Sequence, residues 1–153
     1  MVSGFILDSM HLIYLGIIKK ILTMFFSIKV INKKLRLDRN TKDYFNSKLN
    51  QYQVHVPCEF GRKLEGGVTT ILKWKASQYR LFGLYIGIVL FGHRKICSKQ
   101  FHRNFLRLSI ALRLLNTPNQ NCNLNYIQAL LYEFHEESKV IFGKQFFLSL
   151  IHI

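Results

Sequence analysis

Two side chains near the N-terminus, Asp8 and His11, are of types that occur in catalytic metal sites. A carboxylate between an extended segment and a helix is well placed to bind Mg²⁺, which prefers oxygen ligands. Phosphoryl transfer with two metal ions needs more than one carboxylate, and Glu133, Glu136 and Glu137 are expected on the solvent side of a late helix. Asp8 is therefore interpreted as a helix N-cap and His11 as a packing residue. They are at most vestiges of a catalytic site, and no metal site is predicted.

A second group of candidates consists of cations near an aromatic side chain. The chain has 22 Lys and Arg residues against 8 Asp and Glu residues, a formal net charge of +14. This excess predicts an anionic partner, nucleic acid or an acidic membrane surface. Cations neutralise phosphates, and an aromatic ring among them can stack on a base or wedge between bases. The candidate nucleic-acid-binding residues are Lys73, Trp74, Lys75, Arg80, Arg103 and Arg107. The competing interpretation is a core tryptophan beneath solvated basic helix faces.

Other kinds of site find no support in the residue pattern. Cys58, Cys97 and Cys122 are far apart and odd in number, which fits neither a disulfide framework nor a zinc site. His135 begins a His-Glu-Glu triplet without the second histidine of a zinc protease motif. The chain contains no glycine-rich phosphate loop, dinucleotide-binding turn or nucleophile elbow. We therefore predict no cofactor and no enzymatic activity.

Two apolar stretches were considered as membrane spans. Residues 10–31 are long enough, but Lys19, Lys20 and Lys29 lie within them, and each central charge costs about 2.5–3.5 kcal/mol on insertion. Residues 81–92 are too few to cross a hydrocarbon layer of about 30 Å. No transmembrane segment is predicted.

The elements that would position these residues are mainly helices. The sequence predicts a mainly α fold, about five helices in an irregular bundle after a short N-terminal extended stub at residues 5–7. The first helix is capped by Asp8 or Ser9 and runs to about residue 27, with apolar residues almost all round it. The second opens near Thr41 with Asp43. The third covers about residues 70–90 and places Trp74 inside a helix.

The fourth and fifth helices have the clearest apolar periodicity. Ser98 is predicted to cap the fourth, whose apolar stripe repeats at helical spacing. Asn123 is predicted to cap the fifth, which ends near residue 143. The stripe residues are Phe101, Phe105, Leu108, Leu112 and Leu115 in the fourth helix, and Leu124, Ile127, Leu130, Leu131 and Phe134 in the fifth.

The C-terminal segment 146–153 begins at Phe146, ends at Ile153 and is strongly apolar. Such a segment is unfavourable in water. We expect that it is covered either by residues beyond the present sequence or by a protein partner. The domain is accordingly predicted to be incomplete.

Five short words occur in order along the chain: DSMHL at 8–12, VPCEF at 56–60, WKASQYR at 74–80, FGKQF at 142–146 and LIHI at 150–153. In that order they resemble part of the CACTA (En/Spm-like) transposase-derived proteins, from the end of the catalytic core into the following helical domain of unknown function. The resemblance implies a single truncated domain, with residues 1–39 from the end of the core and 40–153 from the helical region. It also implies that most of the acidic catalytic residues are missing.

The resemblance and the charge together predict a truncated transposase-derived protein without autonomous catalysis. Such a chain would act at most as a non-specific basic module that contacts DNA phosphates, and its expected location is the nucleus, or otherwise the cytoplasm. Three alternatives stay open. They are a cationic amphipathic module at a membrane surface, best fitted by residues 12–34, a protein–protein interaction module, and a non-functional relic reading frame.

Overall fold

The computed structural model describes residues 10–26, 37–64, 66–117, 124–143 and 146, and within these it is mainly helical, without strands. This confirms the predicted mainly α fold with about five helices. The predicted extended stub at residues 5–7 lies outside the described residues. The helical segments are η1 (Met10–Ile18) continued by α1 (Lys19–Phe26), α2 (Arg39–Gln53), α3 (Ala76–Leu81) continued through η6 (Phe82–Ile86) into α4 (Gly87–Gly92), α5 (Lys99–Asn116) and α6 (Leu124–Phe142). Short 3₁₀ turns are η3 (Cys58–Phe60), η4 (Gly67–Thr69) and η5 (Ile71–Lys73).

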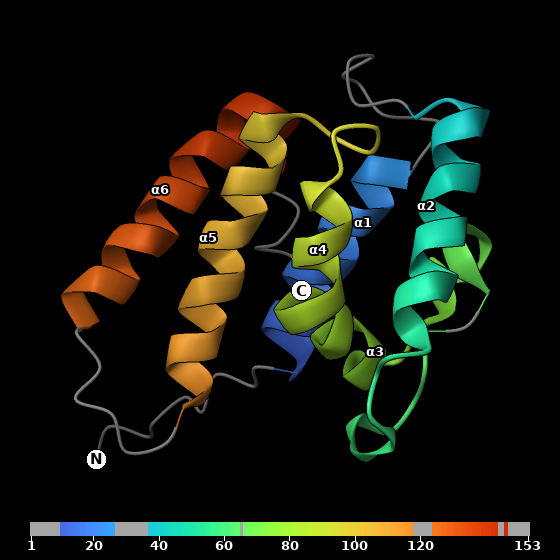
Figure 1. Ribbon diagram of the computed structural model, residues 1–153. Helices are drawn as coiled ribbons and strands as arrows, with labels where there is room; N and C mark the ends of the chain where they lie inside the picture. Colours follow the sequence, from blue (N-terminus) through green and yellow to red (C-terminus); the bar gives the residue numbers. More distant parts are fainter. Residues whose placement is uncertain (1–9, 27–36, 65, 118–123, 144–145, 147–153) are drawn as a thin grey trace.

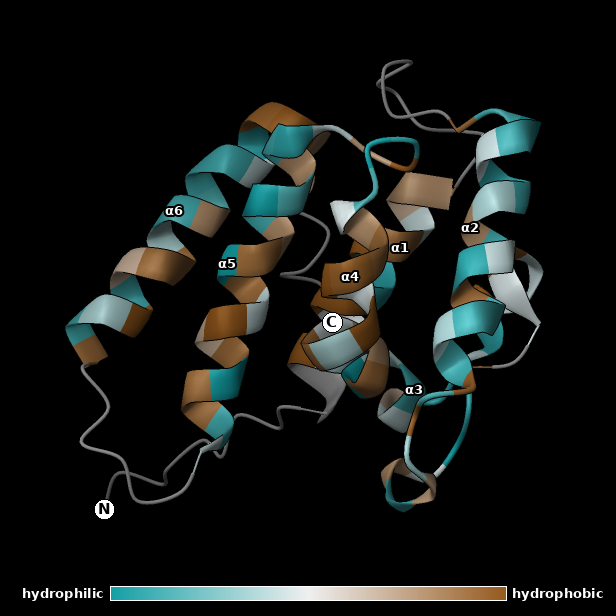
Figure 2. Cartoon of the chain, in the orientation of Figure 1, coloured by the Kyte–Doolittle hydropathy of each residue, from teal (hydrophilic) through white to brown (hydrophobic). Residues whose placement is uncertain are grey.

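The helices pack around α4, which lies at the centre of the molecule (Figure 1). Helices α5 and α6 run antiparallel on one side of α4, and α2 lies on the other side. Figure 2 shows α4 as mostly hydrophobic and α2 as mostly hydrophilic. These colours agree with the burial of Leu90 and Phe91 in α4 and of only Phe45 and Leu49 in α2.

The core is rich in aromatic rings centred on Phe82. The ring centroid of Phe82 lies 5.6 Å from that of Phe91, 5.8 Å from Trp74, 6.2 Å from Phe105 and 6.4 Å from Phe45. Aromatic pairs at such distances add about 0.5–1.5 kcal/mol each to the free energy of burial. One core therefore joins α2, the helix at 76–92 and α5.

The helix at 10–26 belongs to the same core. Ile18, Ile21, Leu22 and Phe25 are buried, and the Phe25 ring lies 4.7 Å from that of Phe101 in α5. This burial agrees with the apolar residues that lie almost all round the first predicted helix. Residues on both sides of position 39 share one hydrophobic core.

The C-terminal apolar segment begins by packing against the chain itself. Phe146 is buried, its ring is stacked on that of Phe142 at 4.7 Å, and Lys20 donates a hydrogen bond to its carbonyl oxygen. The Lys20 ammonium also lies 5.3 Å from the centre of the Phe146 ring, and burial lowers the pKa of this lysine. Phe146 itself is thus covered by the chain, and the expectation of a cover from outside stays a prediction for the rest of the segment. Residues 147–153 lie outside the described part of the chain.

A wide turn in the third helix attaches it to α5. In η6 the Gly87 N–H donates to the Phe82 carbonyl, five residues back, rather than to the carbonyl of Gly83. The Gly83 carbonyl instead accepts a hydrogen bond from the Ser109 hydroxyl at 2.6 Å. Arg113 donates through Nε to the Leu84 carbonyl at 2.8 Å. Two side chains of α5 thus satisfy backbone acceptors at the wide turn.

Some predicted helix details hold and others do not. Ser98 caps α5 as predicted, because its hydroxyl accepts the Phe101 N–H at 3.2 Å. Helix α2 begins at Arg39 rather than near Thr41, because Asp38 is its N-cap and accepts the Thr41 N–H.

Two leucines of the predicted apolar stripes are also misplaced. Leu115 and Leu124 are 51% and 69% exposed, not buried. Leu115 is in the last turn of α5 and Leu124 is the first residue of α6. Both helices therefore extend past the part of the core that covers their middle turns.

Candidate nucleic-acid interface: a basic pocket around Trp74

The segment before α3 differs from the prediction, and the difference creates the candidate site. The predicted helix begins at Ala76, six residues later than expected, and the preceding residues form the turns η4 and η5. Trp74 has φ −61° and ψ 148°, which is extended. The prediction that Trp74 lies inside a helix is therefore wrong. Trp74 precedes α3, in which Ser77 is exposed and Leu81 is buried.

Two side chains at the start of α3 hold this segment in place. The Tyr79 hydroxyl donates to the Ile71 carbonyl at 2.5 Å, and burial raises the pKa of Tyr79 to about 12. The Gln78 side chain accepts the Lys75 N–H at 2.8 Å and donates to the Lys63 carbonyl at 2.7 Å. Gln78 thereby ties residue 63 to residue 75, across a gap of twelve positions in the sequence.

The loop between these two segments is anchored on α2. The Asn46 side-chain oxygen accepts the Val68 N–H at 2.8 Å. Gly67 has φ +62°, and a Cβ there would lie 2.4 Å from the same Asn46 oxygen. Glycine is therefore required at 67 both by its backbone conformation and by the close approach of α2.

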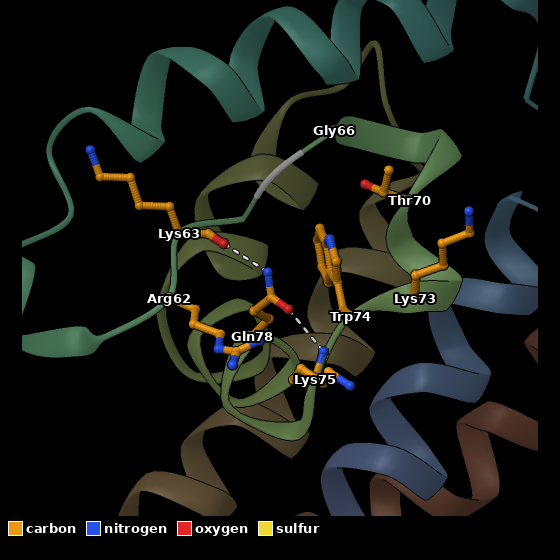
Figure 3. A pocket seen from close by; sticks show the side chains of 8 residues that line it. All are labelled: Arg62, Lys63, Gly66, Thr70, Lys73, Trp74, Lys75 and Gln78. Atoms are coloured by element: carbon orange, nitrogen blue, oxygen red, sulfur yellow. Dashed lines mark hydrogen bonds between the residues drawn. The ribbon is translucent and has the colours of Figure 1, made fainter.

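These contacts form a basic pocket with a volume of about 610 Å³. Four cations line it, and all four are exposed. Figure 3 shows Trp74 at the middle of the pocket, with Arg62 and Lys63 on one side of it, Lys73 on the other and Lys75 below it; the Lys63 side chain extends away from Trp74. The described lining residues include no carboxylate; they are Arg62, Lys63, Gly66, Thr70, Lys73, Trp74, Lys75 and Gln78.

Trp74 forms a wall of this pocket. Its side chain is only 5% exposed, and its ring centroid lies 5.8 Å from those of both Tyr79 and Phe82. A ring this buried has little face left for a base to stack on. The interpretation as a core tryptophan beneath basic side chains is the one that fits this geometry, and base stacking on Trp74 is not supported.

The remaining predicted nucleic-acid-binding residues lie elsewhere. Arg80 is exposed and lines a separate hollow of about 180 Å³ together with Glu59, Phe60 and Tyr85. Arg103 is exposed on α5, and Figure 1 shows α5 on the opposite side of α4 from α2, the helix that anchors the pocket loop. The structure therefore does not bring Arg103 to the basic pocket.

Arg107 does not lie on a solvated face. Its guanidinium donates to Glu137 and lies 2.8 Å from a carboxylate oxygen of Glu133, both on α6. Its side chain is 19% exposed, and that of Glu137 is 16% exposed. One turn away, Asn104 donates to the Ser138 hydroxyl at 2.8 Å within the same helix pair. The expectations of a solvated Arg107 and of a solvent-facing Glu137 are therefore wrong, because α6 packs on that side of α5.

The two N-terminal candidates cannot be placed as side chains. Asp8 lies outside the described residues, and His11 lies in η1 without a described side-chain position. Among the residues that the structure describes, no three His, Cys, Asp or Glu side chains are grouped as metal ligands would be. In the same part of the chain, none of the helices is both long and apolar enough to cross a membrane.

The predicted site residues did not include five that line the pocket, among them the cations Arg62 and Lys63 and the bridging Gln78. A basic pair followed within four residues by Gly66 and Gly67 was a usable signal, since a glycine-rich turn can bring flanking cations to one place. Gln78 gave no signal, because a glutamine in a helix is expected on the surface.

Comparison of the chain with protein-family models, with curated proteins and with solved structures gives no match.

Proposed function

We propose that this chain is a non-catalytic, transposase-derived nuclear module that binds nucleic acid through phosphate contacts, without reading base sequence. The observation that supports the proposal most is that four exposed cationic residues line one pocket. Cations grouped at one place neutralise several phosphates of one strand together. The ordered resemblance to CACTA (En/Spm-like) proteins supports the transposase origin.

The burial of Trp74 is the reason for proposing binding without sequence preference. Direct reading of bases needs side chains that reach base edges, or exposed rings that stack on them. The pocket instead presents Arg62, Lys63, Lys73 and Lys75, whose charges attract phosphates of any sequence.

Two alternatives have weaker support from the packing. A membrane-surface helix at 12–34 would need its apolar side free, but Ile18, Ile21, Leu22 and Phe25 are buried in the core. A protein partner for the C-terminal segment has less to cover when Phe146 is already buried. Nucleic-acid binding, in contrast, would use the four cations of the pocket, which are already exposed.

The test is a salt titration of binding to a labelled duplex of arbitrary sequence, with anionic lipid vesicles as the comparison ligand. The slope of log affinity against log salt is expected to be about −0.9 for each phosphate contacted. The double variant Lys73→Gln/Lys75→Gln should weaken binding and reduce the slope by about 2 × 0.9.

A matched control removes the same charge outside the pocket. Arg94 and Lys99 are both exposed and do not line the pocket, so Arg94→Gln/Lys99→Gln should leave the slope nearly unchanged. Equal losses in the two double variants would show that total charge, and not the pocket, determines binding. Binding to vesicles that persists at high salt, with none to duplex DNA, would overturn the proposal.

A further inference from the structure

The backbone segments that carry the four cations of the basic pocket are tied to one another. Gln78 bonds the backbone of both cation-bearing segments, at Lys63 and at Lys75. Tyr79 holds the carbonyl of Ile71, at the start of the turn that ends at Lys73. A general basic surface needs no such ties. A braced backbone around the cations lowers the conformational entropy lost when one compact ligand binds, because only the cationic side chains are left to order.

We propose that this pocket is a specific site for a run of adjacent phosphates, as found in an oligophosphate or at the phosphorylated end of a nucleic-acid strand. The inference deepens the proposed function, because it assigns one ligand chemistry to the place where the non-specific phosphate contacts meet. It makes Arg62, Lys63, Lys73 and Lys75 the anion-binding residues.

The charge and shape of the pocket favour clustered phosphates over a single phosphodiester. A phosphodiester carries one negative charge, whereas a phosphate monoester carries about −1.5 to −2 at pH 7. Four cations around one cavity are matched better by the denser charge. The volume of about 610 Å³ lies within the range of about 300–1,000 Å³ that is usual for ligand sites.

Trp74 strengthens the attraction without contacting a base. Its buried ring forms an apolar, low-dielectric wall beside the cations. A cleft with charges of one sign and such a wall concentrates the electric field within the cleft. The ligand is therefore recognised by its phosphates, and we expect no preference for the attached base.

Trp74 also supplies the assay, because it is the only tryptophan in the chain. Inorganic phosphate, tripolyphosphate, and one oligonucleotide with either a 5′-phosphate or a 5′-hydroxyl are titrated against the tryptophan fluorescence of the full chain. Tripolyphosphate should change the fluorescence and bind at least about tenfold more tightly than inorganic phosphate, because each additional charged hydrogen bond contributes about that much. Arg62→Gln/Lys75→Gln should weaken tripolyphosphate binding by at least about tenfold by the same reasoning, whereas Arg94→Gln/Lys99→Gln should change it less than about twofold.

The two oligonucleotides identify the source of the phosphates. Stronger competition by the 5′-phosphorylated strand assigns the pocket to strand ends, and equal competition assigns it to free oligophosphates. Equal affinity for phosphate and tripolyphosphate, or equal losses in the pocket and control variants, would overturn the inference. That result leaves the proposed function standing if duplex DNA is still bound with the expected salt slope. Conversely, binding of tripolyphosphate without binding of duplex DNA would support the phosphate site in the pocket and refute the proposed nucleic-acid-binding function.

Discussion

A comparison of Arg107 with Arg103 tests whether a cation of α5 stabilises the fold or is available for binding. Its guanidinium contacts two carboxylates of α6, with 2.8 Å between its Nε and an oxygen of Glu133 and a second bond to Glu137. Arg103, one turn earlier on the same helix, is exposed. Replacing each by glutamine removes the same charge from the same helix, but only Arg107→Gln breaks the bridge between α5 and α6.

The magnitude follows from the partial burial of the group. Exposed ion pairs contribute about 0.2–1 kcal/mol, and breaking a fully buried pair costs about 3–5 kcal/mol. The Arg107 and Glu137 side chains are 19% and 16% exposed, whereas that of Glu133 is 56% exposed. An intermediate loss of about 1–3 kcal/mol is therefore expected for Arg107→Gln. At about 2–4 °C per kcal/mol for a chain of this size, Tm should fall by about 2–12 °C.

The assay is chemical unfolding followed by far-UV circular dichroism and by Trp74 fluorescence, with duplex affinity measured on the same samples. Coincident transitions in the two signals are needed before a free energy is assigned. Arg103→Gln should change the free energy of unfolding by no more than about 0.5 kcal/mol. If Arg107→Gln leaves stability within that limit and weakens duplex binding more than Arg103→Gln does, the assignment of Arg107 as a bridge between α5 and α6 is refuted.

Two further predictions concern the core and the support of the pocket. A Cβ at Gly87 would lie 2.6 Å from the Phe82 ring and 2.9 Å from the Phe105 ring, so Gly87→Ala should destabilise the fold by about 1–3 kcal/mol; an unchanged urea midpoint would contradict this packing. Tyr79→Phe should cost about 0.5–1.5 kcal/mol at pH 8, because one of the two hydrogen bonds to the Ile71 carbonyl is lost and the Trp74 N–H still donates to it. Burial raises the pKa of Tyr79 to about 12, above its usual value of about 10, so its contribution is present below about pH 10 and is lost as pH rises through about 12. Unfolding curves at pH 8, 10 and 11 should therefore show a smaller alkaline loss for Tyr79→Phe than for the unsubstituted chain; equal losses would contradict it.

Local signals explain the parts of the fold that were predictable. Helix α5 was predicted from Ser98 and from the repeat of apolar residues, and Phe101, Phe105, Leu108 and Leu112 are buried as expected. A cap and a helical repeat act within a few residues, so neither depends on the rest of the molecule.

The third helix shows where local reasoning fails. Residues 70–75 have apolar and basic residues that fit a helix, yet the chain is extended at Trp74. The bond from Tyr79 to Ile71 and the contact of the Trp74 ring with Phe82 hold the segment in this conformation. Such contacts override a weak helical preference, and the pocket depends on this override.

The sequence by itself determined the helical class, the first, fourth and fifth helices, and the large positive charge, because these follow from composition and short-range periodicity. The tertiary structure alone decided which cations are paired and which are exposed. It places Arg107 between two carboxylates and groups Lys63 with Lys75 through Gln78. The physical reason is that the residues that can neutralise a charge are often distant from it in sequence. Only packing decides whether they lie beside it.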